Sequence, residues 1–169
     1  SGKKLRAVLD LCRESYVGGQ ATVEEQWGFT RDWDRVGWFD EGVWLRMATD
    51  CYVTHDPTAA TIYDWKTGKS FGNEVKYMQQ MQLYAVGAFM REPTLEIAEV
   101  VIGFLDDGKQ RTKSFERGDK INKLCKRFTD RFERMTSCVD FKPKPNKGNC
   151  RYCPFSPQGT GACIYGVEC

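Results

Sequence analysis

Apolar and polar positions alternate along the chain with two distinct periods, which predict helices and strands respectively. In three segments the apolar residues recur every three or four positions, which is the period of an amphipathic helix. In five others they recur at every second position or form short apolar runs, with glycine, proline or aspartate between them. The predicted helices span 4–16, 73–91 and 118–137, and the predicted strands span 22–30, 43–54, 60–66, 96–105 and 110–116.

The apolar stripes of these segments predict which side chains lie in the core. The helix 73–91, with Asn73 as its predicted N-cap, has an apolar stripe made by Tyr77, Met81, Tyr84, Ala85 and Ala88. The helix 118–137 has a stripe made by Ile121, Leu124, Cys125, Phe128, Phe132 and Met135. Its opposite face is basic and consists of Lys120, Lys123, Lys126, Arg127, Arg131 and Arg134. In the strand 22–30, the alternation of side chains predicts that one face of the strand carries Val23, Glu25, Trp27 and Phe29.

The order of the elements favours an α+β fold in which helices flank a central mixed sheet. Three strands follow the first helix and the later strands are mixed with helices, an arrangement typical of this class. The predicted core spans residues 1–142, with a hairpin turn at Asp107-Gly108. Pro143, Pro145 and the neighbouring lysines predict an exposed connector. A tail of residues 143–169 follows and is expected to pack on the core.

Composition sets broad limits on what the protein is. With 169 residues, 41% of them apolar and 28% charged, the chain suits one globular domain with a sizeable core. No apolar run predicts a membrane span, and no signal peptide is visible, whereas Ser1-Gly2 resembles the scar of a cleaved tag. The net charge is only +2, but the segment 109–147 is rich in lysine and arginine. That segment is predicted either to contact phosphates or to be a solvated face.

Eight cysteines add a candidate metal chemistry. Without a secretory signal a disulfide framework is disfavoured, so clustered cysteines indicate a metal site. The last twenty residues contain Cys150, Cys153, Cys163 and Cys169. Four such thiols suit a zinc ion or an iron–sulfur cluster, and a reduced tail without metal is the alternative. The dispersed cysteines, predicted to be buried as small apolar side chains, are Cys12, Cys51, Cys125 and Cys138.

Charged residues stand at the ends of two predicted strands. Asp50 lies late in the strand 43–54, and Asp64 and Lys66 end the strand 60–66. Residues i and i+2 of a strand face the same way, so Asp64 and Lys66 share a side. Two carboxylates that converge at strand ends suit Mg²⁺ or Mn²⁺, and a lysine beside them can assist the attacking water in phosphodiester hydrolysis. The plain alternative is a surface ion pair.

The segment 46–84 resembles the signature of the RecB-like PD-(D/E)XK nuclease family. Its members include the nuclease domains of RecBCD- and AddAB-type repair complexes, nucleases of CRISPR adaptation and phage exonucleases. The family pattern is an aspartate at a strand end, an apolar strand ending Asp-Tyr-Lys-Thr-Gly, and a helix with Gln-x-x-x-Tyr. The matching positions are Asp50, Asp64-Trp65-Lys66-Thr67-Gly68 (with tryptophan for tyrosine), Gln80 and Tyr84.

The resemblance implies a restriction-endonuclease-like core and a DNA exonuclease of recombination and repair. It implies Mg²⁺ or Mn²⁺ held by Asp50 and Asp64, with Gln80 and Tyr84 on a helix beside the active centre. For the tail it implies a [4Fe–4S] cluster, with zinc as the alternative and either Cys12 or Cys169 as the fourth ligand. It also implies recombination or repair partners and a cytoplasmic location, in a bacterial cell or a phage-infected host.

The chain departs from the family pattern at one metal ligand, and this keeps two other interpretations open. Family members carry a His or Glu in an N-terminal helix, but the only histidine here, His55, follows the second predicted strand. Glu14, Glu24 and Glu25 are the nearest carboxylates, so the ligand is expected either upstream, in a truncated helix, or replaced. The other interpretations are a non-catalytic nucleic-acid-binding module whose four tail cysteines hold zinc, and a degenerate nuclease domain within a larger complex.

Overall fold

The computed structural model describes residues 2–68, 70–140 and 142–169, with side chains from residue 6 onward. The chain forms two compact units, Ser1–Arg131 and Phe132–Cys169. The predicted boundary at residues 142 and 143 stays a prediction. None of the helices in the described part of the chain has the length and apolar composition needed to cross a membrane.

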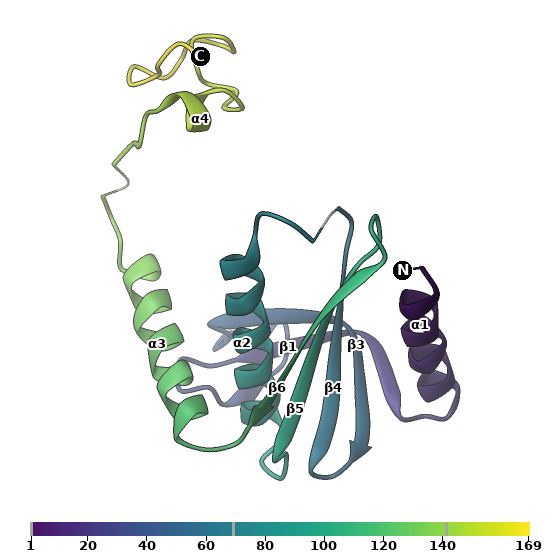
Figure 1. Ribbon diagram of the computed structural model, residues 1–169. Helices are drawn as coiled ribbons and strands as arrows, with labels where there is room; N and C mark the ends of the chain where they lie inside the picture. Colours follow the sequence, from purple (N-terminus) through teal and green to yellow (C-terminus); the bar gives the residue numbers. More distant parts are fainter. Residues whose placement is uncertain (1, 69, 141) are drawn as a thin grey trace. The chain divides into compact units, whose positions relative to one another are not determined.

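The first unit is built on one six-stranded mixed sheet (Figure 1). The strand order is β2-β1-β3-β4-β5-β6. All neighbours are antiparallel except β4 and β5, which are parallel. Parallel neighbours need a crossover connection, and the helix α2 (Glu74–Arg91) provides it. The strands are β1 (Ala21–Phe29), β2 (Arg35–Val36), β3 (Leu45–Asp56), β4 (Ala59–Lys66), β5 (Ile97–Phe104) and β6 (Lys109–Glu116).

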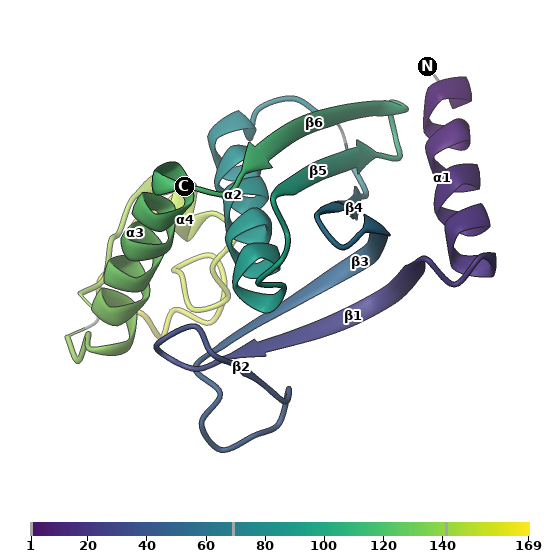
Figure 2. The same ribbon diagram turned by 90° about the horizontal axis from the view of Figure 1, so that it is seen from below.

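Helices lie on both faces of this sheet (Figures 1 and 2). The helix α1 (Gly2–Val17) covers one face, and α2 covers the other. The helix α3 (Asp119–Thr136) follows β6 and runs beside α2, whereas the short α4 (Lys147–Cys150) belongs to the second unit. An α+β fold with a mixed sheet flanked by helices is therefore confirmed.

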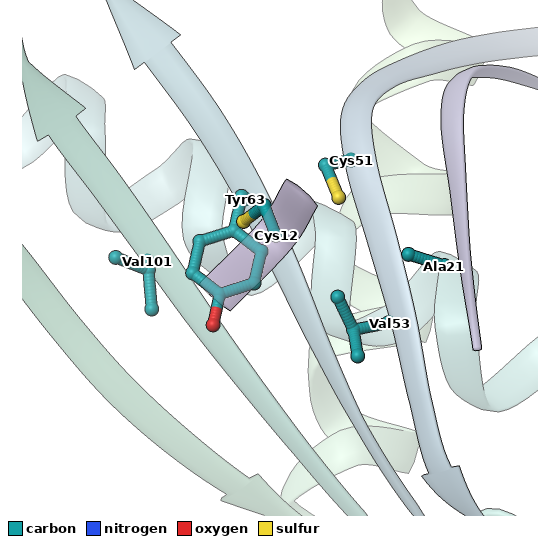
Figure 3. Close-up of a cluster of buried hydrophobic side chains, with 6 residues drawn as sticks. All are labelled: Cys12, Ala21, Cys51, Val53, Tyr63 and Val101. Carbon is teal, nitrogen blue, oxygen red and sulfur yellow. The ribbon is translucent and has the colours of Figure 1, made fainter. Parts of the chain in front are cut away.

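The core on the α1 face contains two thiols in contact (Figure 3). Cys12 of α1 and Cys51 of β3 are buried beside Val53, Tyr63 and Val101. A hydrogen bond between the thiols, together with burial, raises the pKa of Cys12, and the same bond lowers the pKa of Cys51. Both are free thiols, so they serve here as small core side chains, as the sequence predicts.

The core on the α2 face depends on a glycine within the helix. A Cβ atom at Gly87 would lie 2.5 Å from Cε of Met47 and 3.3 Å from the ring of Trp27. Both of those side chains are buried. The missing side chain therefore lets α2 approach β1 and β3 closely, which helps to bring its polar residues to the sheet.

Every predicted helix and strand is present with ends within one or two residues, but several side-chain predictions are wrong. Strict alternation in β1 fails because Glu24 has a φ of 51° and Val23 is half exposed, although Trp27 and Phe29 are buried. Met135 and Cys138, predicted to be buried, are exposed. Asn73 is the N-cap of α2, but its side chain makes no capping hydrogen bond.

Candidate active site

The antiparallel strands β3 and β4 each contribute one aspartate to this site, Asp50 in the middle of β3 and Asp64 near the end of β4, so the strand end predicted for Asp50 is wrong. Cys51 pairs with Tyr63 in the antiparallel register, so one step along the strands Asp50 is opposite Asp64. Oδ2 of Asp50 accepts a hydrogen bond from the backbone N–H of Trp65 at 2.5 Å. Asp50 is exposed, whereas Asp64 is only 4% exposed. The structure thus places one carboxylate at the surface and the other inside, on adjacent strands.

Three side chains converge on the buried carboxylate. The Lys66 ammonium lies 3.0 Å from Oδ1 of Asp64 and 2.7 Å from its Oδ2. From α2, Nε2 of Gln80 donates to Oδ1 at 3.2 Å, and the Tyr84 hydroxyl lies 2.8 Å from the same oxygen. A buried carboxylate without partners would be costly, and these contacts offset that cost.

The two residues from α2 also contact one another. Gln80 and Tyr84 are one helical turn apart and therefore share a face, and Nε2 of Gln80 donates to the Tyr84 hydroxyl at 3.2 Å. The hydroxyl also lies 3.0 Å from the carbonyl oxygen of Ala48 in β3. Burial, and then the negative charge of Asp64, raise the pKa of Tyr84 well above its ordinary value. Tyr84 is therefore a neutral donor that joins α2 to β3 and β4.

One oxygen of the buried carboxylate has capacity left for a cation. Among the described residues no donor reaches Oδ2 of Asp64 in hydrogen-bonding geometry, although the Lys66 ammonium is close. This oxygen is fully buried in the protein. Carboxylate oxygens are the ligands that Mg²⁺ and Mn²⁺ prefer. The donor set of Asp64 and Asp50 therefore fits a hard divalent cation.

No third carboxylate completes a cation site within the described part of the chain. Groups of three or more His, Cys, Asp or Glu side chains suited to a metal are absent there. Of the sequence candidates, Glu25 is in contact with Arg91 and with the hydroxyl of Thr22, and Glu14 lies on α1. Glu24 is exposed in β1 at the residue with positive φ. None of the three is grouped with Asp50 and Asp64 in the described part of the chain.

A polar network beside the site was not predicted from the sequence. Oδ2 of Asp107 accepts from both the N–H and the hydroxyl of Ser70, at 3.2 and 2.8 Å. Arg111 donates to the Ser70 carbonyl oxygen and to Glu74 at the start of α2. These contacts tie the connection between β4 and α2 to the β5–β6 hairpin. The Asp107-Gly108 signal predicted the hairpin turn, but no local pattern indicated its long-range partners.

The four tail cysteines lie in the second unit but do not form a metal-binding group. Cys150 is buried, Cys153 and Cys163 are half-buried, and Cys169 is exposed. The thiol of Cys169 meets the backbone oxygens of Lys147 and Val167. No three metal-ligating side chains are grouped in the residues the structure describes. The predicted cluster or zinc site is therefore not supported by this arrangement.

Comparisons with known proteins give one clear match. The sequence profile of the PD-(D/E)XK nuclease superfamily matches residues 4–158. A comparison with curated proteins gives no significant match. Among solved structures, the crystal structure of SSO0001 is similar over 96% of this chain and 70% of that chain, at 15% identity and a TM-score of 0.44. A likeness at that score carries no argument about this chain.

Proposed function

Because this chain belongs to the PD-(D/E)XK nuclease superfamily, we propose that it is a metal-dependent DNA nuclease of the RecB-like kind. The proposed activity is hydrolysis of phosphodiester bonds at DNA ends, as an exonuclease of recombination or repair. The observation that carries the proposal is the convergence of Lys66, Gln80 and Tyr84 on the buried carboxylate of Asp64. The strand motif and the helix motif of the RecB-like pattern meet at this carboxylate.

Each residue of the centre has a proposed task that follows from its position. Asp50 and Asp64 hold Mg²⁺ or Mn²⁺, which when bound polarises the phosphate and lowers the pKa of a water molecule. Lys66, with its side chain 29% exposed, can reach a phosphate while staying beside Asp64. Its ammonium orients the attacking water and stabilises negative charge on the phosphate oxygens. Gln80 and Tyr84 keep the Asp64 carboxylate in one orientation.

Cleavage of end-labelled DNA with Mg²⁺ or Mn²⁺ tests this proposal. Asp64→Ala and Lys66→Ala should each abolish cleavage, while circular dichroism shows that the fold is retained. Asp56→Ala is the matched control, because Asp56 ends the same strand as Asp50 but is exposed, and its carboxylate accepts hydrogen bonds from the turn that follows, at Thr58 and Ala59. Cleavage at wild-type rate by Asp64→Ala or Lys66→Ala would remove the proposed centre. DNA binding without cleavage by the wild type would favour a binding module or a degenerate nuclease.

For the tail we propose, on the RecB-like pattern alone, a [4Fe–4S] cluster on Cys150, Cys153, Cys163 and Cys169, which would have to gather thiols that are not grouped for metal binding in this structure. Thiolates are the right donors for such a cluster, and Cys12 is disfavoured as a ligand because it is buried against Cys51. Protein purified without oxygen should be brown and contain iron. Cys169→Ala should lose the iron, whereas Cys12→Ala and Cys138→Ala should keep it. If the purified protein contained stoichiometric zinc and no iron, the cluster would be ruled out in favour of a zinc site.

A further inference from the structure

A groove of about 510 Å³ lies between the edge strand β6 and the first half of α3. Its floor is apolar, because Phe115 and Ile121 are buried there and Leu124 is half-buried. Three lysines line it from two elements, and we call Lys113, Lys120 and Lys123 the groove lysines. The remaining lining residues are Gln82, Ser114 and Glu116.

Alternation in β6 decides which charges face this groove. The Phe115 side chain lies on the groove floor, and Lys113 is two residues away in the same strand, so the two share a face. Ser114 and Glu116 alternate to the opposite face, where the Ser114 hydroxyl is 3.5 Å from Glu99. The one acidic residue of the lining therefore directs its carboxylate away. The groove carries the positive charge of its three lysines.

The groove lysines also form no close ion pair with a carboxylate in the described part of the chain. No ion pair joins any of them to a described carboxylate, whereas Lys126 on the same helix pairs with Asp130 at 4.0 Å and Lys109 in β6 pairs with Asp107 at 3.6 Å. Clustered ammonium groups repel one another. A polyanion is attracted to such a cluster of positive charge.

A basic stripe continues from the groove along α3 and contacts α2. Steps of three or four residues put Lys120, Lys123, Arg127 and Arg131 on one side of α3. Arg127 donates to Gln82 at 2.6 Å, and Arg131 donates to Gln79 at 3.1 Å. Both glutamines belong to α2, on another side of the helix from Gln80, which contacts Asp64.

We propose that the β6–α3 groove holds a single-stranded segment of the DNA substrate, with successive phosphates on the groove lysines and the basic stripe. The inference rests on the proposed nuclease function and adds the strandedness and path of the substrate. A polyanion matches the unpaired positive charge, and the apolar floor of the groove suits the unstacked bases that a single strand presents and a duplex does not. Phosphates recognised in this way are bound without regard to base sequence.

Binding of fluorescent oligonucleotides over a series of salt concentrations tests the proposal. The measurement uses the whole 169-residue chain with Asp64→Asn, so that no cleavage interferes, and a thymidine homopolymer, which stays single-stranded. Lys123→Gln and Lys113→Gln should each reduce the slope of log affinity against log salt by about 0.7, the contribution of one phosphate contact on a single strand. The matched control is Lys126→Gln, on the same helix but outside the groove lining, and it should leave the slope unchanged.

The outcomes separate this inference from the proposed function. Equal slopes for Lys123→Gln and Lys126→Gln overturn the groove assignment, even if the wild type cleaves DNA. Equal slopes accompanied by self-association of Lys113→Gln would show instead that the lysines protect the β6 edge from pairing. Weaker binding by both groove variants supports the assignment, even if no cleavage is found. Tighter binding of duplex DNA, or of a uridine homopolymer, would overturn the single-stranded DNA assignment.

Discussion

The Tyr84 hydroxyl, on the middle of α2, lies 2.8 Å from Oδ1 of Asp64, near the end of β4. The same hydroxyl accepts from Gln80, and its own hydrogen has two acceptors in reach, Oδ1 of Asp64 and the carbonyl oxygen of Ala48 at 3.0 Å, of which the charged carboxylate oxygen is the nearer. Since burial keeps Tyr84 neutral, it donates to a charged acceptor inside the protein. Such hydrogen bonds are stronger than neutral ones, and this one connects the stability of the α2–β4 packing with the orientation of Asp64.

Replacing Tyr84 with phenylalanine should change both the level and the pH dependence of stability. Tyr84→Phe should lower the free energy of unfolding by about 2 kcal/mol near neutral pH, because one hydrogen bond to a charged group is lost. The pKa of Tyr84 is raised on folding, so its contribution is complete below the ordinary tyrosine pKa of 10.0 and is lost as the pH rises beyond it. In urea unfolding the wild type should therefore lose stability more steeply than Tyr84→Phe above about pH 10.

Some alkaline loss should remain in the variant, since burial also raises the pKa values of Tyr52 and Tyr63 to about 12. If the stability of both proteins fell equally steeply with pH above about pH 10, Tyr84 would ionise as easily in the folded chain as in the unfolded one.

Gln80 should act on catalysis, whereas its neighbour Gln79 should not. Gln80→Ala removes the amide that holds Oδ1 of Asp64, so kcat should fall roughly 10- to 100-fold, the equivalent of one hydrogen bond to a charged group. Gln79→Ala is matched in type and burial, but Gln79 contacts Arg131 on the other side of α2. Steady-state cleavage rates measure both variants. A KM effect without a kcat effect in Gln80→Ala would place this amide on the substrate instead of on the carboxylate.

Local periodicity and the family resemblance together predicted which residues would lie at the candidate centre. That Asp64 and Lys66 share a side follows from the strand period, and that Gln80 and Tyr84 share a face follows from the helical period. Neither period predicts that the helix face with Gln80 and Tyr84 contacts the end of the strand with Asp64 and Lys66. The contact was expected only from the resemblance, because packing of α2 on the sheet depends on distant residues such as Gly87.

The features that escaped prediction all depend on tertiary structure. Glu24 has a positive φ, a conformation that glutamate rarely adopts alone, so no local signal could have located the irregularity in β1. The strand β2 has two residues and α4 has four, which is too short for a period to show. Met135 continues an apolar stripe but lies near the end of α3 in the second unit. The stripe alone does not show at which residue of the helix the side chains stop being buried.

Arg117 should be a stability residue with no direct part in the candidate centre. Its guanidinium donates to the carbonyl oxygens of Leu95, Phe89 and Glu92 and lies over the Phe89 ring. Lysine keeps the charge but cannot make a planar fork, so Arg117→Lys should lower the free energy of unfolding by about 2 kcal/mol. Urea denaturation measures this loss. Lys126→Ala, which breaks only an exposed pair, should change stability by about 0.5 kcal/mol or less, and an equal loss in both variants would contradict the assignment.

A divalent cation should stabilise the folded protein through Asp50 and Asp64, and aspartate-to-asparagine changes separate that effect from folding itself. Asp64→Asn keeps an oxygen that accepts from Gln80 and Tyr84, and Asp50→Asn keeps one for the Trp65 N–H. Both remove the charge that a hard cation requires. At a Mn²⁺ concentration of about 100 Kd, the wild type should gain about 2.7 kcal/mol, seen as a higher Tm in calorimetry.

Neither asparagine variant should show that gain, whereas Asp56→Asn should keep it in full, because Asp56 ends β3 and its carboxylate contacts the adjoining turn at Thr58 and Ala59. This experiment needs no substrate, so it tests the cation site even if the nuclease activity proves absent. If Asp64→Asn gained as much from Mn²⁺ as the wild type, the orphaned Oδ2 of Asp64 would not be a cation ligand. The role of that carboxylate would then be limited to pairing with Lys66 across 2.7 Å.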